Sequence, residues 1–362
     1  MKSFIKRLTS NQIFIPCAAL LLLALFNLIA DPSFFKVTLD HNNNGDPVLK
    51  GFLINILDNG SELAILAIGM TLVTAASGGQ DISVGAGIAI AGSVILRVLC
   101  GSNPRPESLQ SSLIVALLIA ILVSMAFSAF NGILVAYFKI QPMIATLILF
   151  TAGRSIAAWI NQNQLPIIST SCDKTFGYWG TYIPGIPIPT PVFIAAICII
   201  IIMLVLKFTN LKLYTQAVGI NPKSSRLNGL NPELIKVIAF VILGICVAIC
   251  GLIKVSRFQT INYSVVAKDI EMDAILAVAL GGNALSGGKF NMWGSILGAY
   301  VIQFLTTTLY KLEVSSDALP AYKAVVVILL VVTSAPVVRE KLSKIFKKKA
   351  SAGSKREGGA AA

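Results

Sequence analysis

Long apolar runs separated by short polar stretches dominate the chain and predict a succession of hydrophobic helices. About ten of these runs approach the roughly 20 residues that a helix needs to cross a bilayer. The eighth run is short and is interrupted by glycines. The pattern predicts an all-α polytopic membrane protein of about ten transmembrane helices, some broken by glycine-rich segments. The runs lie at 13–30, 60–77, 82–99, 112–138, 142–160, 189–207, 234–253, 273–282, 290–310 and 321–338.

Composition agrees with a chain whose solvent is lipid. Hydrophobic residues make up 56% of the 362 positions and charged residues only 12%, whereas a soluble domain carries about 25% charged residues. We therefore expect one transmembrane domain over 1–345. The remaining 346–362 is basic and then rich in Gly, Ser and Ala, which predicts a disordered cytoplasmic tail because it has no apolar face to bury.

The distribution of basic residues predicts the orientation in the membrane. Lys2, Lys6 and Arg7 precede the first run, and the stretch 207–236 holds five basic residues against Glu233 as its only acid. Such loops stay in the cytoplasm, so both termini are expected there, in the inner membrane of a bacterium. The net charge of +13 is explained by these loops, and membrane lipid rather than nucleic acid is the expected partner.

Two glycine-rich segments resemble each other. Residues 78–85 and 281–288 both fit Gly-Gly-x-x-(Ile/Leu)-Ser-x-Gly, and both follow an apolar helix. Six predicted spans separate them, so both would face the same side of the membrane. This arrangement predicts two halves related as a parallel internal repeat, as in some transporters.

The same segments are the candidate solute path. Broken helices are tolerated in membranes where they face protein or a watery cavity, and their polar groups are then available to a solute. Two structural alternatives stay open: Asp81 as the cap of a helix beginning at Ile82, and the glycines as helix-packing residues. The candidate path residues are Gly78, Gly79, Gln80, Asp81, Ser83, Gly85, Gly281, Gly282, Asn283 and Ser286.

No catalytic, nucleotide or metal site is predicted. The stretch ending in Gly288-Lys289 looks like a phosphate-binding loop, but Asn283 replaces its first glycine and Phe290 its hydroxyl residue. His41 is the only histidine, which leaves no material for histidine-based metal sites. Cys100 and Cys172 lie in polar loops and would pair only if both faced an oxidising compartment.

Few ionisable residues fall within the predicted spans. We expect Glu271, just before the eighth run, to be part of a solvated loop end, although carboxylates there could also relay protons. Arg154 is either a snorkelling residue or a pathway residue. A secondary transporter or channel working without ATP would need several buried charges, so this pattern leaves it as the less favoured alternative.

Three segments together resemble the permease family of ribose, galactose and galactofuranose ABC importers. Residues 67–85 resemble its Gly-Met-Thr-Leu-Val and Gly-Gly-x-Asp-Leu-Ser-Val-Gly motifs, and 280–294 resemble its Leu-Gly-Gly-x-x-Leu-x-Gly-Gly…Trp-Gly motif. Residues 217–230 resemble its cytoplasmic loop. Gln80 departs from the family's usual aliphatic residue and Ser155 from its usual glycine, which leaves the sugar undefined, with a slight lean toward the galactofuranose type.

The resemblance implies a division of labour among several proteins. A cytoplasmic ABC ATPase would bind and hydrolyse ATP, so this chain would need no cofactor and be no enzyme. An extracytoplasmic sugar-binding protein would deliver a monosaccharide, and a second permease subunit, identical or different, would complete the path. The resemblance implies that the loop docking on the ATPase contains Gly219, Asn221, Arg226, Leu227 and Gly229.

Overall fold

The computed structural model describes residues 14–41 and 45–334. The predicted tail at 346–362, and with it the boundary of the expected domain at 345, lies outside these residues. The elements within unit 1, from the first described residue to Thr308, are α2 (Phe14–Ala30), η1 (Pro32–Phe35), β1 (Thr38–His41), β2 (Pro47–Lys50), α3 (Phe52–Ser77), α4 (Val84–Cys100), α5 (Leu113–Ala136), α6 (Pro142–Ile160), η2 (Phe176–Trp179), α7 (Thr190–Phe208), α8 (Leu211–Ile220), α9 (Pro222–Leu227), α10 (Pro232–Phe258), α11 (Ile270–Leu280) and most of α12 (Met292–Lys311).

The described residues from Leu309 to Ser334 belong to a second compact unit. Its described part holds the end of α12 and α13 (Leu319–Ser334). Each of the ten predicted runs overlaps one helix, namely α2 to α7 and α10 to α13.

The all-α polytopic class is confirmed. Within the described residues, six helices are long and apolar enough to cross a membrane: α3, α5, α6, α7, α10 and α12. The count of ten spans and the internal repeat stay predictions. The second glycine segment lies between α11 and α12. The first lies between α3 and α4 except for its last two residues, which open α4.

Local chemistry explains several helix boundaries. Proline stands in the first turn of α6, α7 and α10, where its missing N–H costs nothing. Asn231 caps α10, since its side chain accepts a hydrogen bond from the N–H of Leu234. Gly78 ends α3 in the left-handed conformation and donates its N–H to the Thr74 carbonyl.

Two regions differ from the sequence expectation. The stretch between the first two predicted runs contains a small antiparallel sheet, in which Thr38 pairs with Lys50 and His41 with Pro47. Helix α3 begins at Phe52, eight residues before the apolar run. Asn55, Asp58 and Asn59 interrupt the apolar pattern there, although the first turns are helical.

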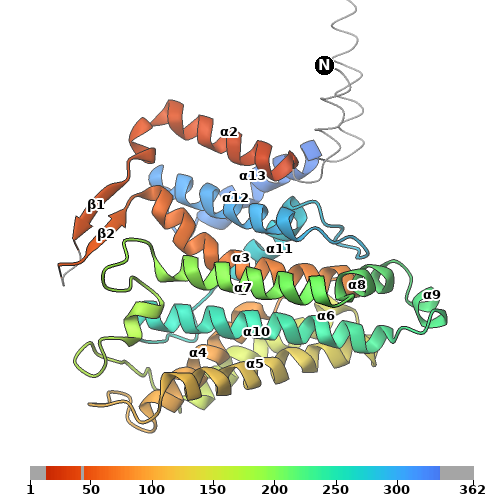
Figure 1. Cartoon of the computed structure of the whole chain (residues 1–362), viewed down its shortest axis with the longest axis horizontal. Helices are drawn as coiled ribbons and strands as arrows, with labels where there is room; N and C mark the ends of the chain where they lie inside the picture. Colours follow the sequence, from red (N-terminus) through yellow and green to blue (C-terminus); the bar gives the residue numbers. More distant parts are fainter. Residues whose placement is uncertain (1–13, 42–44, 335–362) are drawn as a thin grey trace, which may run out of the picture. The chain divides into compact units, whose positions relative to one another are not determined.

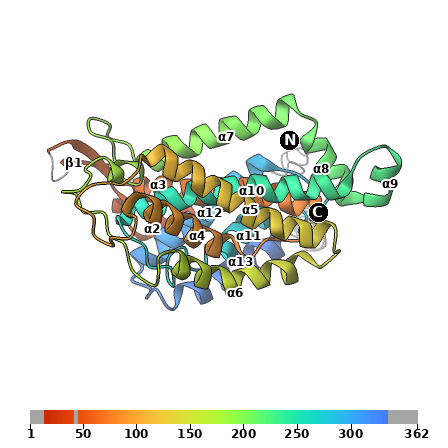
Figure 2. The ribbon, with the colours of Figure 1, turned by 90° about the horizontal axis from the view of Figure 1, so that it is seen from below.

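Helix α3 is the most deeply buried of the long helices. Helix α10 packs against α3, α4 and α5, and it runs alongside α5 in both views (Figures 1 and 2). Small residues permit these close contacts: a Cβ on Gly69 would lie 3.2 Å from the Cys246 sulfur, and one on Gly251 would lie 2.7 Å from the Ala91 side chain. Cys100 and Cys172 are both free thiols.

Candidate transport site

The two glycine segments, about 200 residues apart in sequence, lie against each other. The Gln80 side-chain amide donates a hydrogen bond of 3.1 Å to the Leu285 carbonyl, and the Gly288 N–H donates one of 3.0 Å to the Ala75 carbonyl at the end of α3. A Cβ on Gly287 would stand 3.0 Å from the Gly78 Cα. The contact is therefore between backbones, which only glycine permits at this distance.

The end of α8 reaches the same place. A Cβ on Gly219 would collide with the Ala75 carbonyl and lie 3.0 Å from the Gly288 Cα, and one on Gly288 would lie 2.6 Å from the Ile220 side chain. We call this meeting point of Ala75, Gly78, Gly219, Gly287 and Gly288 the glycine junction. It brings together all three segments that the sequence singled out.

Asp81 organises the start of α4. It is 1% exposed, and its Oδ1 accepts hydrogen bonds from the N–H of Ser83 at 2.7 Å and the Ser83 hydroxyl at 2.6 Å. Asn131 of α5 donates to the same hydroxyl at 2.9 Å. These bonds form a turn just before α4. The helix begins at Val84, with Ser83 at its N-cap position and no side-chain cap hydrogen bond, so Asp81 does not cap a helix beginning at Ile82.

Asn283 closes the segment between α11 and α12. Its Oδ1 accepts the N–H of Asn291 at 2.6 Å, and its Nδ2 donates to the Ser295 hydroxyl at 2.8 Å. The Thr71 hydroxyl of α3 also donates to Ser295, at 2.6 Å. The second glycine segment is thereby tied to α3 by a buried hydrogen-bond chain.

The remaining candidate path residues differ in their exposure and in their neighbours. Ser286 is exposed, whereas Gln80 is buried. Gly79 packs on Pro142, and a Cβ on Gly281 would collide with the backbone at Gly294. Gly282 takes a left-handed φ of 80°. Most of the polar groups of the set therefore have partners within the subunit, and contact with a solute requires these bonds to rearrange.

Gly85 lies against Glu271, which corrects one expectation. Glu271 is buried in the first turn of α11 and is not a solvated loop end, and its Oε2 has no hydrogen-bond partner among the described residues. A Cβ on Gly85 would collide with that oxygen. Nearby, Arg154 donates to the carbonyls of Tyr263 at 2.9 Å and Val266 at 3.0 Å.

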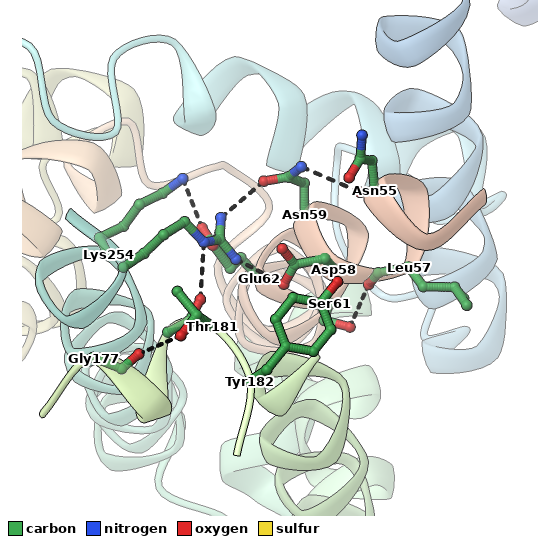
Figure 3. Close-up of polar contacts among 12 residues, drawn as sticks. Asn55, Leu57, Asp58, Asn59, Ser61, Glu62, Gly177, Thr181, Tyr182 and Lys254 are labelled. Carbon is green, nitrogen blue, oxygen red and sulfur yellow. Dashed lines mark hydrogen bonds and ion pairs between the residues drawn. The ribbon is translucent and has the colours of Figure 1, made fainter. Parts of the chain in front are cut away.

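A buried charge network corrects the expectation that the span interiors are nearly free of charge. Figure 3 shows Lys254 and Glu62 in contact. The Glu62 carboxylate, 1% exposed, pairs with Lys254 at 2.8 Å and with Arg257 at 2.6 Å. Arg257 also pairs with Asp58 at 2.8 Å. Two acids and two bases thus compensate one another between α3 and α10.

The same arginine extends the network to a connecting segment. Arg257 donates to the Asn59 side chain at 2.8 Å and to the Gly180 carbonyl at 3.1 Å. Tyr182 donates to the Leu49 carbonyl at 2.9 Å. Burial, and then the nearby Asp58 carboxylate, raises the pKa of the Tyr182 phenol. The network therefore joins α3, α10 and the segment that follows η2.

A sequence signal for this network existed. Glu62 is the only acid in the predicted run 60–77, and Lys254 and Arg257 stand three residues apart just after the run 234–253. Helix α10 continues through both basic residues to Phe258, so they share a face. The predicted run stopped at Ile253, just before both basic residues.

The coupling loop forms two short helices, α8 and α9. Helix α9 lies between Gly219 and Gly229 and carries Arg226 and Leu227. Asn221 caps it by accepting a hydrogen bond from the N–H of Ser224. Leu227 is 90% exposed. Arg226 and Lys139 both pair with Glu233 at the start of α10.

The six helices long and apolar enough to cross a membrane place the chain in the class of polytopic membrane proteins. The chain belongs to the family described as the permease component of the branched-chain amino acid transport system, which it matches over residues 52–335. No solved structure matches the chain.

Curated relatives of similar length are sugar permeases by name. The chain is 36% identical to the galactofuranose transporter permease protein YtfT of Escherichia coli, over 87% of each chain. It is 34% identical to the fructose import permease protein FruF of Bifidobacterium longum, over 96% of this chain and 94% of the relative. It is 33% identical to the ribose import permease protein RbsC of Escherichia coli, over 87% and 90%.

Proposed function

We propose that this chain is the membrane-spanning permease subunit of an ATP-driven importer for a monosaccharide. The observation that carries the proposal is the glycine junction, in which the exposed loop α8–α9 contacts both glycine segments. A loop that docks an ATPase must pass its movement to the solute path, and this contact is direct. The names of the relatives support a sugar of the galactofuranose, fructose or ribose kind.

The partners follow from this role. A cytoplasmic ABC ATPase binds the ATP, an extracytoplasmic binding protein delivers the sugar, and a second permease subunit completes the path. Both termini lie in the cytoplasm, and ten helices span the membrane, with a basic tail at 346–362. In the proposed repeat, α3–α4 corresponds to α11–α12, because a glycine segment joins the helices in each pair.

The docking surface of the loop combines apolar and basic side chains. Leu213, Ile220 and Leu227 are largely exposed, and Lys223 and Arg226 lie beside them in α9. Exposed apolar side chains inside a basic loop are expected where another protein covers them. We propose that the ATPase covers this surface.

The glycine segments form the inner end of the sugar path. Neutral, hydroxyl-rich solutes need hydrogen-bond partners and little net charge. Gln80, Ser83, Asn283 and Ser286 supply such partners once their internal bonds open. Cysteines placed singly at these four positions should react with a water-soluble thiol reagent in at least one nucleotide state. Absence of reaction at all four in every state would place the path elsewhere.

Reconstitution tests the function itself. The chain, purified with its ATPase and supplied with the binding protein, should take up labelled monosaccharide into vesicles only with internal ATP and Mg²⁺, and the isolated chain should hydrolyse no ATP. Uptake driven by an ion gradient without the ATPase would instead establish the alternative, an ATP-independent secondary transporter or channel. Within the network between α3 and α10, the four charges are paired with one another.

Substitution at Gly229 separates docking from folding. No atom lies within 4 Å of a Cβ placed there, although φ is +81°. Gly229→Leu therefore projects away from this subunit, toward the space assigned to the ATPase. We expect normal insertion and loss of sugar-stimulated ATPase activity, whereas Gly185→Leu, equally left-handed and open, should retain activity. Equal activity in both variants would contradict docking at this loop.

A further inference from the structure

An open groove lies between the end of α7 and the start of α12. It encloses about 640 Å³. Its wall from α7 is apolar and includes Met203 and Leu204, and its other wall includes Phe290 and Trp293. Trp293 is half exposed although it is a large aromatic residue. The groove is therefore wide enough for an extended hydrocarbon chain and is lined by groups that favour one.

Two lysines stand at one end of this apolar wall. Lys207 lies in the last turn of α7 and Lys212 in the first turn of α8, and both line the groove. Neither forms an ion pair with any described residue, and no acid is among the described lining residues. Lys212 lies 5.9 Å from the Phe290 ring centre. The groove thus combines an apolar channel with uncompensated positive charge at its end.

We infer that this groove binds one anionic phospholipid, with its phosphate on Lys207 and Lys212 and an acyl chain along Met203 and Leu204. Helix α7 is a 19-residue apolar helix in which few side chains are buried, so lipid would surround much of it in a membrane. Its lysine end lies at the headgroup level, where tryptophan also concentrates. Basic pockets between helices at that level bind anionic headgroups.

The site adjoins the glycine junction. Asn291 lines the groove and also holds the second glycine segment through Asn283. Lys212 belongs to α8, whose other end is Gly219. A phospholipid in the groove therefore contacts both α8 and the segment that α8 presses upon. This inference rests on the membrane location of the chain and not on the identity of its substrate.

Native mass spectrometry of the purified full-length chain in detergent tests the site. Phosphatidylglycerol and phosphatidylcholine are titrated separately into wild type and into Lys207→Ala/Lys212→Ala. We expect the wild type to prefer phosphatidylglycerol, and the double variant to bind it about 30-fold more weakly, at about 5-fold per lysine. Lys223→Ala, an exposed lysine of α9 outside the groove, should bind as the wild type does.

Other results would overturn the inference. Equal affinity of the wild type for the two lipids, or unchanged phosphatidylglycerol binding in the double variant, excludes this site. Displacement of the lipid by glycerol phosphate alone would show a soluble-phosphate site instead. A double variant that loses the dimer while keeping its lipid would show that a second permease subunit covers the groove. None of these measurements depends on sugar uptake, so failure here is separable from failure of the proposed function.

Discussion

The two ends of α3 are held in opposite ways. Near its start, Asp58 and Glu62 are fixed by ion pairs to Arg257 and Lys254 of α10. Near its end, Ala75 is fixed by backbone contact with Gly219 and Gly288, where no side chain intervenes. The start of α3 is held by ion pairs, and its end is held by a backbone contact that an added side chain would block.

The difference teaches what each end tolerates. An ion network is directional and collapses when one partner is lost, because the remaining charge is then buried alone. A glycine contact has no such partner, and it allows backbones to slide or separate as long as nothing is added between them. The start of α3 is thus suited to holding a fixed arrangement, and its end is suited to movement.

The largest expected effect is at the charged end. Arg257→Ala leaves Asp58 and Glu62 without their shared cation, and breaking a buried pair in this way costs about 3–5 kcal/mol of unfolding free energy. Denaturant or thermal unfolding of the purified chain in detergent measures it. Lys50→Ala, which removes the exposed pair with Asp40, should cost at most about 1 kcal/mol. Similar losses of unfolding free energy in the two variants would show that water reaches the charges of the network.

An intermediate effect is expected at the glycine end. Gly219→Ala adds a methyl group that collides with the Ala75 carbonyl, and overpacking of this kind costs about 1–3 kcal/mol. Sugar-stimulated ATP hydrolysis should fall much more than stability does, since the contact lies between the coupling loop and the path. Gly185→Ala adds its methyl group to open space and should leave hydrolysis unchanged. Unimpaired coupling in Gly219→Ala would remove the junction from the mechanism.

The smallest effect concerns the hydrogen bond that ties α3 to the second glycine segment. Thr71→Val keeps the shape of the side chain and removes its donor to Ser295, while Ser295 retains its bond from Asn283. We expect the unfolding free energy to fall by about 0.5–1.5 kcal/mol and sugar uptake to fall a few-fold. Thr151→Val is the matched control, because its exposed hydroxyl bonds only within α6. Equal losses of unfolding free energy in the two variants would show that the hydrogen bond from Thr71 to Ser295 does not stabilise the fold.

Sequence predicted the helices better than it predicted their ends. The run 142–160 coincides with α6 because Pro142 fixes its first turn. The start of α3 was missed because Asp58 and Asn59 read as loop residues, although Arg257 compensates them within the fold. Hydropathy counts each residue separately, so it cannot register a charge whose partner lies about 200 residues away.

The candidate site was predicted in its parts but not in its assembly. Glycine motifs marked all three segments of the junction, since glycine is informative wherever backbones approach closely. Nothing in one sequence states that Gly219 meets Gly288. For Asp81, the sequence left capping and solute contact open. Its bonds to Ser83 form a turn before α4 rather than a helix cap, and solute contact stays a prediction.

Helix α10 is a single rod of 27 residues, about 40 Å long at 1.5 Å per residue. It begins beside the coupling loop, where Glu233 holds Arg226, and it carries Lys254 and Arg257 near its far end. No proline interrupts it after Pro232, so no proline kink separates its two ends. A rigid tilt of about 5° about its midpoint would displace each end by about 2 Å. A displacement of that size would strain the ion pairs at the far end, so the network that fixes the start of α3 would also resist a tilt of α10 that begins at the loop.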